Sequence, residues 1–367
     1  MTAGFWPAWV AGRLDEVRAA GRWRAPRDLD AGGPAARLVG DGGDGAPATP
    51  VVSFASNDYL GLSQHPAVVA AAHEALDRFG AGSGAARLIV GSRPVHGALE
   101  TALAEWKGEE AAVLFSTGFM ANLGVLATFG GPGVRILSDE LNHASIIDGC
   151  RLAAADVAVY RHSDVDHVEA LLAAGGEAPA IVVTDTVFSM DGDLAPVEAL
   201  AEACARHGAL LVLDEAHAVL GPNAALDGVD HLRVGTLSKT LGSLGGFVAG
   251  PRPFVDLLVN RARSYIFTTA SSPPDTATRS RQVPGATVGG RMAGTSRPRS
   301  SSAAAAASAR SSEPSTTGTI GDGCPGATTS TFARSLATSP SPSAERRTPS
   351  AARAAAVSGG LEAVVKM

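Results

Sequence analysis

The stretch ALLVLDEAHA, residues 209–218, decides the fold class. Its first half, ALLVL, is a continuous apolar run without polar alternation, which is typical of a strand buried on both faces in a parallel sheet covered by helices. Polar residues begin where this run ends, at Asp214, and His217 follows three positions later. A second run, RVG, leads in the same way into Thr236 and Lys239. The two stretches predict buried strands whose carboxyl ends carry reactive side chains.

Short apolar runs alternate with helical stretches between residues 111 and 250. The runs cover 111–115, 134–138, 157–160, 180–185, 209–215, 233–236 and 245–250, and helices are predicted over 121–129, 144–154, 164–173 and 196–207. This alternation predicts a doubly wound α/β domain with its site at the carboxyl ends of the strands. Upstream, the apolar spacing predicts helices over 8–24, 66–79 and 94–107, with a loop or weak hairpin over 25–50.

The predicted strands end in polar residues that suit one cofactor. These residues are Ser116, Thr117, Asp139, His143, Asp185, Ser189, Asp214, His217, Thr236, Ser238 and Lys239. A lysine can hold pyridoxal 5′-phosphate as a Schiff base, a carboxylate can keep its pyridine nitrogen protonated, and an imidazole can stack on its ring. Backbone N–H groups at a helix start can bind its phosphate. In isolation Lys239 is an ordinary surface lysine and Asp214 a helix cap, but Asp-x-x-His followed by Thr-x-x-Lys favours the cofactor.

Seven motifs make the sequence similar to a known family, the α-oxoamine synthases. The matching stretches are SNDYLGL (56–62), GAGSGAARLIVGS (80–92), STGFMANLGV (116–125), LNHASIIDGCRL (141–152), VFSMDGD (187–193), DEAHA (214–218) and GTLSKTLGSLGG (235–246). The resemblance covers about residues 8–272. It implies a fold-type-I pyridoxal phosphate enzyme with a mostly parallel sheet, which condenses an amino acid with an acyl-CoA and works as a homodimer.

The resemblance also implies roles around the cofactor ring. Lys239 carries the cofactor and acts as acid and base at the substrate α-carbon. Asp214 pairs with the pyridinium nitrogen, His217 hydrogen-bonds the 3′-oxygen and His143 stacks over the ring. Ser189 is expected to lie beside the cofactor.

Further roles concern the phosphate and the substrates. The resemblance implies that Thr236 and the backbone of Gly118 and Phe119 hold the phosphate. Arg24 is the expected contact with the acyl-CoA substrate, and residues 268–269 (both threonine) are expected to reach the partner subunit's phosphate.

The implied reaction joins L-alanine to a pimeloyl thioester, of CoA or of an acyl carrier protein, in biotin biosynthesis. A member of the family that uses glycine and acetyl-CoA is an alternative. A third possibility is an inactive, truncated relative, because the family's C-terminal domain is not legible in this sequence.

The composition changes abruptly at residue 273. Residues 273–367 contain 11 large apolar residues, and 11 basic against 5 acidic residues, in a background of Ser, Ala, Pro, Thr, Gly and Arg. So few large apolar groups cannot offset the ordering entropy of a fold, so this tail is expected to be disordered. An out-of-frame reading of a GC-rich gene near codons 268–280 explains the change, and a genuine disordered tail is the alternative. The expected organisation is an N-terminal arm (1–50), a large domain (51–260), a linker start (261–272) and the tail.

Composition argues against several other classes of protein. A net charge of −6 argues against nucleic acid or an anionic membrane as main partner. Cys150, Cys204 and Cys324 form no CxxC pair, which favours a reducing, cytoplasmic home and no zinc site. The histidines and aspartates of 162–167 imitate metal ligands but are interpreted as a solvated helix start, so no metal is expected. His96 is interpreted as structural.

Overall fold

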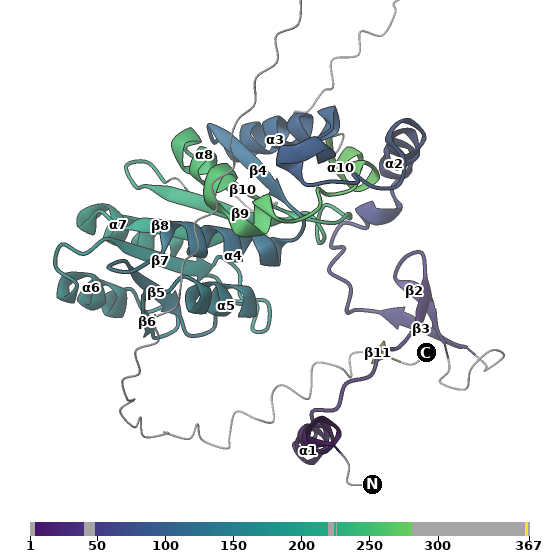
Figure 1. Cartoon of the computed structure of the whole chain (residues 1–367), viewed down its shortest axis with the longest axis horizontal. Helices are drawn as coiled ribbons and strands as arrows, with labels where there is room; N and C mark the ends of the chain where they lie inside the picture. Colours follow the sequence, from purple (N-terminus) through teal and green to yellow (C-terminus); the bar gives the residue numbers. More distant parts are fainter. Residues whose placement is uncertain (1–3, 40–47, 219–223, 225, 281–363, 366–367) are drawn as a thin grey trace, which may run out of the picture. The chain divides into compact units, whose positions relative to one another are not determined.

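The computed structural model describes residues 4–39, 48–218, 224, 226–280 and 364–365. Its main element is a seven-stranded sheet with the order β4–β10–β9–β8–β7–β5–β6 (Figure 1). The strands are β4 (Ala111–Phe115), β5 (Arg135–Asp139), β6 (Asp156–Tyr160), β7 (Ala180–Asp185), β8 (Leu210–Asp214), β9 (His231–Thr236) and β10 (Gly246–Gly250).

Most strands of this sheet run parallel. The pairs β6–β5, β5–β7, β7–β8 and β8–β9 are parallel, whereas β10 is antiparallel to both β9 and β4. Because the carboxyl ends of parallel strands meet at one edge, the residues that follow β5, β7, β8 and β9 are gathered there. The sheet confirms the predicted doubly wound α/β class.

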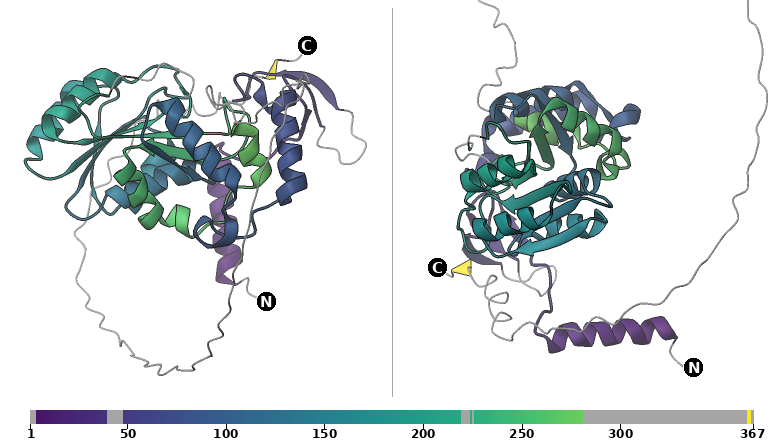
Figure 2. Two further views of the ribbon diagram at one scale, coloured as in Figure 1. Left: turned by 90° about the horizontal axis from the view of Figure 1, so that it is seen from above. Right: turned by 90° about the vertical axis from the view of Figure 1, so that its left-hand side faces the viewer.

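Helices cover both faces of the sheet (Figure 2). One face packs against α4 (Gly118–Phe129), α5 (Ala144–Leu152), α8 (Arg252–Arg261) and α9 (Arg263–Ile266). The other face packs against α6 (Val165–Ala174), α7 (Val197–His207) and α3 (Pro94–Lys107). The helix predicted over 8–24 spans Phe5–Ala19, whereas the helices predicted in the sheet domain are confirmed with small shifts at their ends. The largest of these in the sheet domain is at α4, which begins at residue 118 because Thr117 caps it through Met120 N.

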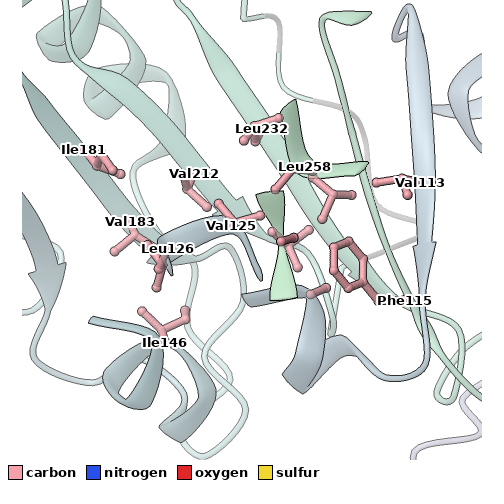
Figure 3. Packing of buried hydrophobic residues seen from close by; sticks show 14 of the residues in the cluster. Val113, Phe115, Val125, Leu126, Ile146, Ile181, Val183, Val212, Leu232 and Leu258 are labelled. Atoms are coloured by element: carbon pink, nitrogen blue, oxygen red, sulfur yellow. The ribbon is translucent and has the colours of Figure 1, made fainter. Parts of the chain in front are cut away.

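Alternate residues of one strand enter the two opposite cores. In β8, Val212 packs with α4 and α5, whereas Leu211 and Leu213 pack with α6 and α7. Figure 3 shows the first of these cores, in which Val212 lies near Val125 of α4. Burial on both faces accounts for the unbroken apolar pattern of the strand.

The N-terminal segment holds one helix and a small sheet. Helix α1 (Phe5–Ala19) is followed by β1 (Leu29–Ala31), β2 (Ala35–Leu38) and β3 (Thr49–Ser53), all antiparallel, and β11 (Val364–Val365) pairs with β3. The expected hairpin within 25–50 is therefore present. The short helix η1 (Leu62–Gln64), α2 (Pro66–Phe79) and the turn η2 (Arg87–Gly91) complete the segment before α3.

The boundary of the expected tail differs from the structure. Helix α10 (Pro273–Ser280) lies beyond residue 272 and packs against α2 and α3, with Thr276 buried. Ser272 begins it, because its hydroxyl accepts from Asp275 N at 3.2 Å and donates to the Asp275 carboxylate at 2.6 Å. A serine followed by proline, with a carboxylate three positions after the serine, is a signal for the start of a helix. The average composition of the tail concealed this signal, so the helix was not predicted from the sequence. The remainder of the expected tail, apart from β11, lies outside the described residues.

No helix within the described residues is both long and apolar enough to cross a lipid bilayer.

Candidate active site

The start of α4 provides an anion-binding group. Thr117 caps the helix, so the N–H groups of Gly118 and Phe119 are free of the first helical hydrogen bonds. Strand β9 brings a hydroxyl close to them, because a Cβ on Gly118 would lie 3.3 Å from Thr236 Cβ. The Thr236 hydroxyl also lies 2.8 Å from the hydroxyl of Ser238. Amides at a helix start with two hydroxyls beside them fit a phosphate dianion.

Lys239 is held by His217. Lys239 Nζ lies 2.8 Å from His217 Nε2, and His217 Nδ1 lies 2.7 Å from the Tyr59 hydroxyl. Burial lowers the pKa of Lys239, although the Asp214 and Asp185 carboxylates oppose this shift. Burial, and then the charges of Lys239 and His143, lower the pKa of His217 to about 4. A neutral imidazole therefore faces an amine that loses its proton more easily than an exposed lysine.

Asp214 is buried and oriented by neutral donors. Its Oδ2 accepts from Asn122 Nδ2 at 2.7 Å, and its Oδ1 accepts from Ala216 N at 2.9 Å. Asn122 Nδ2 also donates to Ser145 Oγ at 2.9 Å, which fixes the amide. Burial raises the pKa of Asp214. Asp214 lines the cavity and forms no ion pair within the described part of the chain, so its carboxylate is available to the protonated nitrogen of a ring.

Asp185 lies beside Asp214 as a second buried carboxyl group. The two residues are paired in register at the ends of β7 and β8. Asp185 Oδ2 accepts from His143 N at 2.7 Å. Burial and then the neighbouring charge of Asp214 raise the pKa of Asp185 to about 7. The pair therefore resists carrying two negative charges.

His143 caps helix α5 next to this pair. Its Nδ1 accepts from Ser145 N at 3.2 Å and lies 2.7 Å from Ser145 Oγ. In the neutral ring the proton is then on Nε2, because Nδ1 serves as the acceptor.

These residues surround one cavity of about 240 Å³. Its lining contains seven of the residues predicted from the sequence: Gly118, Phe119, His143, Asp214, His217, Thr236 and Lys239. The site therefore joins α4, α5 and the ends of three neighbouring strands, as the strand-end pattern predicts.

Two predicted residues lie elsewhere. Ser189 is exposed in the turn after β7, and Arg24 is exposed after α1, and neither lines the cavity. Thr269, one of the two threonines expected at the partner subunit's phosphate, forms an isolated bridge with Ala86, and its predicted contact stays a prediction.

Five further polar residues line the cavity and were given no individual role from the sequence. Asn122 and Ser145 were not singled out there, whereas Thr117, Asp185 and Ser238 were named only as residues at strand ends. Asn122 lies about one helical turn after Gly118 on α4, so the helical period could have placed it beside the anion-binding start. Asp185 and Asp214 each stand at the end of a predicted strand. Their equivalent positions were the signal in the sequence from which a pair of carboxyl groups could have been predicted.

A second, larger cavity of about 520 Å³ adjoins the first and shares His217. Its other walls are mainly apolar and include Val187 and Leu194 from the turn after β7.

The residues of the smaller cavity fit pyridoxal 5′-phosphate. A phosphate dianion matches the start of α4 with Thr236, and a protonated ring nitrogen matches the buried Asp214. Lys239 supplies an amine with a lowered pKa in the same cavity.

Comparison with known proteins agrees with this geometry. Residues 49–282 match the family model described as aminotransferase class I and II. An 8-amino-7-oxononanoate synthase of Anaeromyxobacter sp. (strain K) is 50% identical over 276 residues, which are 72% of this chain and 67% of that protein. The corresponding enzyme of Alkalilimnicola ehrlichii is 47% identical over 287 residues, covering 76% and 72%. The chain thus spans about two thirds of the length of these relatives.

Solved structures share the fold. Serine palmitoyltransferase of Sphingomonas wittichii aligns with a TM-score of 0.67 and 32% identity, over 76% of this chain and 70% of that one. An 8-amino-7-oxononanoate synthase of Francisella tularensis aligns with a TM-score of 0.55 and 28% identity, over 64% and 68%. This protein therefore belongs to the class I and II aminotransferase family, in its α-oxoamine synthase branch.

Proposed function

We propose that this protein condenses L-alanine with a pimeloyl thioester, of CoA or a carrier protein, and releases CO2 and the free thiol to give 8-amino-7-oxononanoate. The observation that carries this proposal is the placement of Lys239 Nζ 2.8 Å from a neutral His217, in one cavity with Asp214 and the start of α4. The names of the relatives with 45–50% identity support the substrates.

Different residues of the site would bind different parts of pyridoxal phosphate. The amides of Gly118 and Phe119, with the hydroxyl of Thr236, would hold its phosphate, and Lys239 would hold it covalently. Asp214 would keep a proton on its ring nitrogen, and Asn122 orients the Asp214 carboxylate through a hydrogen bond. When bound, this cofactor supplies an electron sink that lowers the barrier to losing a proton or CO2 at the amino acid α-carbon.

The chain's own groups then move the protons. Burial lowers the pKa of Lys239, so its neutral amine can take the proton from the α-carbon of alanine and later return one to the product. His217 holds this amine in place and is itself held by Tyr59. His143, which caps α5 and lines the cavity, would stack over the ring.

The acyl donor and the assembly are the further parts of the proposal. The larger cavity, with its mainly apolar walls next to His217, suits a seven-carbon acyl chain. Arg24 is the proposed contact with the thioester carrier, and two copies of the chain form the active dimer.

Borohydride trapping tests the cofactor assignment, because the sequence contains three lysines, Lys107, Lys239 and Lys366. The full chain is incubated with pyridoxal phosphate and reduced, and the modified peptide is identified by mass spectrometry. The label is expected on Lys239, and it disappears in Lys239→Ala but persists in the matched variant Lys366→Ala. A label on Lys107 or Lys366 instead would overturn the assignment.

Substrate choice is tested on the same preparation. Turnover is expected with alanine and pimeloyl-CoA, with far less from glycine and acetyl-CoA or from serine and palmitoyl-CoA. Preference for glycine and acetyl-CoA identifies the alternative reaction. Cofactor labelling without turnover of any pair identifies an inactive relative.

A further inference from the structure

His162 lies between two carboxyl groups that belong to different parts of the chain. Its Nδ1 lies 3.0 Å from Asp139 Oδ1, at the end of β5, and its Nε2 lies 2.5 Å from Asp193 Oδ2. The edge of its ring meets Phe188, with 4.4 Å between ring centres and an interplanar angle of 85°. Within the described residues no group of three or more His, Cys, Asp or Glu forms a metal site. The contacts of His162 therefore have another explanation.

The chemistry of the three groups requires a proton on both ring nitrogens. An ionised carboxylate only accepts hydrogen bonds, and a neutral imidazole donates from one nitrogen alone. Two such bonds at once are available to the imidazolium form, which also gains from both charges.

One side of this arrangement is fixed by the backbone. The Asp139 carboxylate also accepts from Leu141 N at 2.9 Å and from Ser163 N at 2.8 Å. Ser163 has φ of 54°, a left-handed conformation that a residue other than glycine adopts at a cost. His162 N donates to Glu140 Oε1 at 3.3 Å. His162 is thus tied to the end of β5.

The other side is the turn between β7 and α7. Val187 and Leu194 form a bridge across this turn, and Phe188 N donates to Asp193 O at 3.0 Å. The turn carries Ser189, and its two ends line the larger cavity next to His217. Among the residues that the structure describes in this turn, Asp193 alone hydrogen-bonds the His162 ring, so the histidine joins this turn to the sheet.

We propose that protonated His162 is a positioning residue that fastens the turn 187–194 to the end of β5, and that loss of its proton releases this turn. Fastening of the turn stands on these contacts alone. Its consequence for substrate binding, through Val187 and Leu194 of the larger cavity, rests on the proposed function.

The charges around His162 agree with the imidazolium form. Asp139 and Glu140 face it from β5 and the residue after it, and Asp193 faces it from the turn. The neighbouring Arg161 is paired with Asp164 at the start of α6. Burial acts to lower the pKa of His162, but the hydrogen bonds and charges of Asp139 and Asp193 outweigh it and raise this pKa.

Hydrogen exchange of the full chain, followed by mass spectrometry on peptides that contain 186–195, tests the proposal. Rates are corrected for their intrinsic dependence on pH and compared from about pH 5.5 to about pH 9, across the range in which histidine titrates. In the wild type, protection of the turn is expected to fall about fivefold as the pH rises, the scale of one exposed ion pair. Phe188 N–H and Gly192 N–H, which are bonded within the turn, are the reporters.

Three variants separate the charge from the shape of the side chain. His162→Gln, which cannot donate to both carboxylates, is expected to show the low protection at every pH. Asp193→Asn removes the partner of the imidazolium, so the pH step is expected to disappear. His167→Gln is the matched control, because His167 bonds to Arg161 N and not to the turn, and it should keep the wild-type step.

The results decide the proposal in either direction. A wild-type turn whose protection does not change with pH overturns it, and so does a pH step that survives in Asp193→Asn. If His162→Gln does not fold, Asp193→Asn still decides. Since no cofactor or substrate takes part in the exchange experiment, its outcome is independent of the turnover assays.

Discussion

Asp214 and Glu215 are neighbours in sequence and are both buried, yet they have opposite electrostatic surroundings. Asp214, 4% exposed, accepts only from the neutral groups of Asn122 and Ala216. Glu215, 5% exposed, pairs with Lys107 Nζ at 2.6 Å and with Arg233 Nη1 at 2.7 Å. The alternation of side chains along an extended strand end directs Asp214 into the smaller cavity and Glu215 to the other side, where it lines the larger cavity.

The surroundings of Glu215 form a balanced network. Arg233 also bonds to Glu109 at 2.8 Å, and His231 bonds to the same carboxylate at 2.9 Å. Burial acts to raise the pKa of Glu109, but its bonds to His231 and Arg233 outweigh this and lower it. In the cavity, by contrast, burial raises the pKa of both carboxyl groups and lowers that of the lysine. The ion pairs of Glu215 and Glu109 therefore stabilise the fold. The cavity groups, whose charged forms are disfavoured by burial, remain available to bind a ligand and to exchange protons.

The largest effect is expected at the cavity lysine. Lys239→Ala is predicted to reduce turnover by roughly 10³-fold or more, because it removes both the covalent attachment and the proton carrier. The free energy of unfolding without cofactor should change little, since the lysine is half-buried and its hydrogen-bond contact is the neutral His217. Steady-state kinetics and urea unfolding measure the two quantities, and a large loss of stability would contradict the assignment to function.

In the ion-pair network around Glu215, a substitution is expected to reduce stability more than it reduces cofactor binding. Glu215→Ala removes the buried carboxylate that pairs with both Lys107 and Arg233, and leaves Arg233 paired with Glu109. This loss of one buried negative charge is predicted to lower the free energy of unfolding by about 3–5 kcal/mol. Asp214→Asn, next to it, should change this free energy by less than about 1 kcal/mol while it weakens cofactor binding. Urea unfolding of the two variants without cofactor gives the comparison. Equal losses of stability would remove the distinction between the two regions.

The cavity is also expected to differ from the ion-pair network of Glu215 in how its contribution to stability depends on pH. The folded state raises the pKa of Asp185 to about 7, so between about pH 4 and pH 7 it holds a proton that the unfolded chain has released. Stability from this group is present below the unfolded pKa and is lost as the pH rises through about 7. Asp185→Asn should remove a decrease of roughly 1–3 kcal/mol over this range. Thermal unfolding of both proteins without cofactor, at several pH values, measures it, and identical slopes would exclude the effect.

The smallest effect is expected at Ser189. This residue is exposed and does not line the cavity, so Ser189→Ala should weaken cofactor binding by no more than about 1 kcal/mol, the value of one hydrogen bond. Equilibrium titration with pyridoxal phosphate measures it against Thr236→Ala, which should lose more. A larger loss at Ser189 than at Thr236 would place the serine at the phosphate or ring after all.

Much of the fold follows from local sequence signals. Both ends of β7 are predicted correctly, at residues 180 and 185. Its apolar run ends in polar residues, and these mark where the buried part of the strand stops. Helices α2 and α3 are also predicted at both ends, since each begins with proline and ends at a glycine. Helix α10 was missed because the average composition of 95 residues concealed a four-residue cap signal.

The sequence predicts only those residues of the site that closely follow a predicted strand. Asp214, Thr236 and Lys239 follow apolar runs, and the structure brings them to one cavity. The pairing of Asp185 with Asp214 depends on strand order and register, which no local pattern contains. The same holds for His162 and its two carboxylates, which lie 23 and 31 positions away in sequence.

Helix α10 also has a consequence for the gene. Its cap serine, its prolines and the buried Thr276 and Ala277 fit the surface formed by α2 and α3. An out-of-frame stretch has no reason to supply such a fit, so on the hypothesis of a frame change the codons through 277 would still belong to the original reading frame. That hypothesis then places the frame change in the last three codons of the expected window 268–280 or in the bases that follow. One short sequencing read across them distinguishes a frame change from the alternative, a genuine tail.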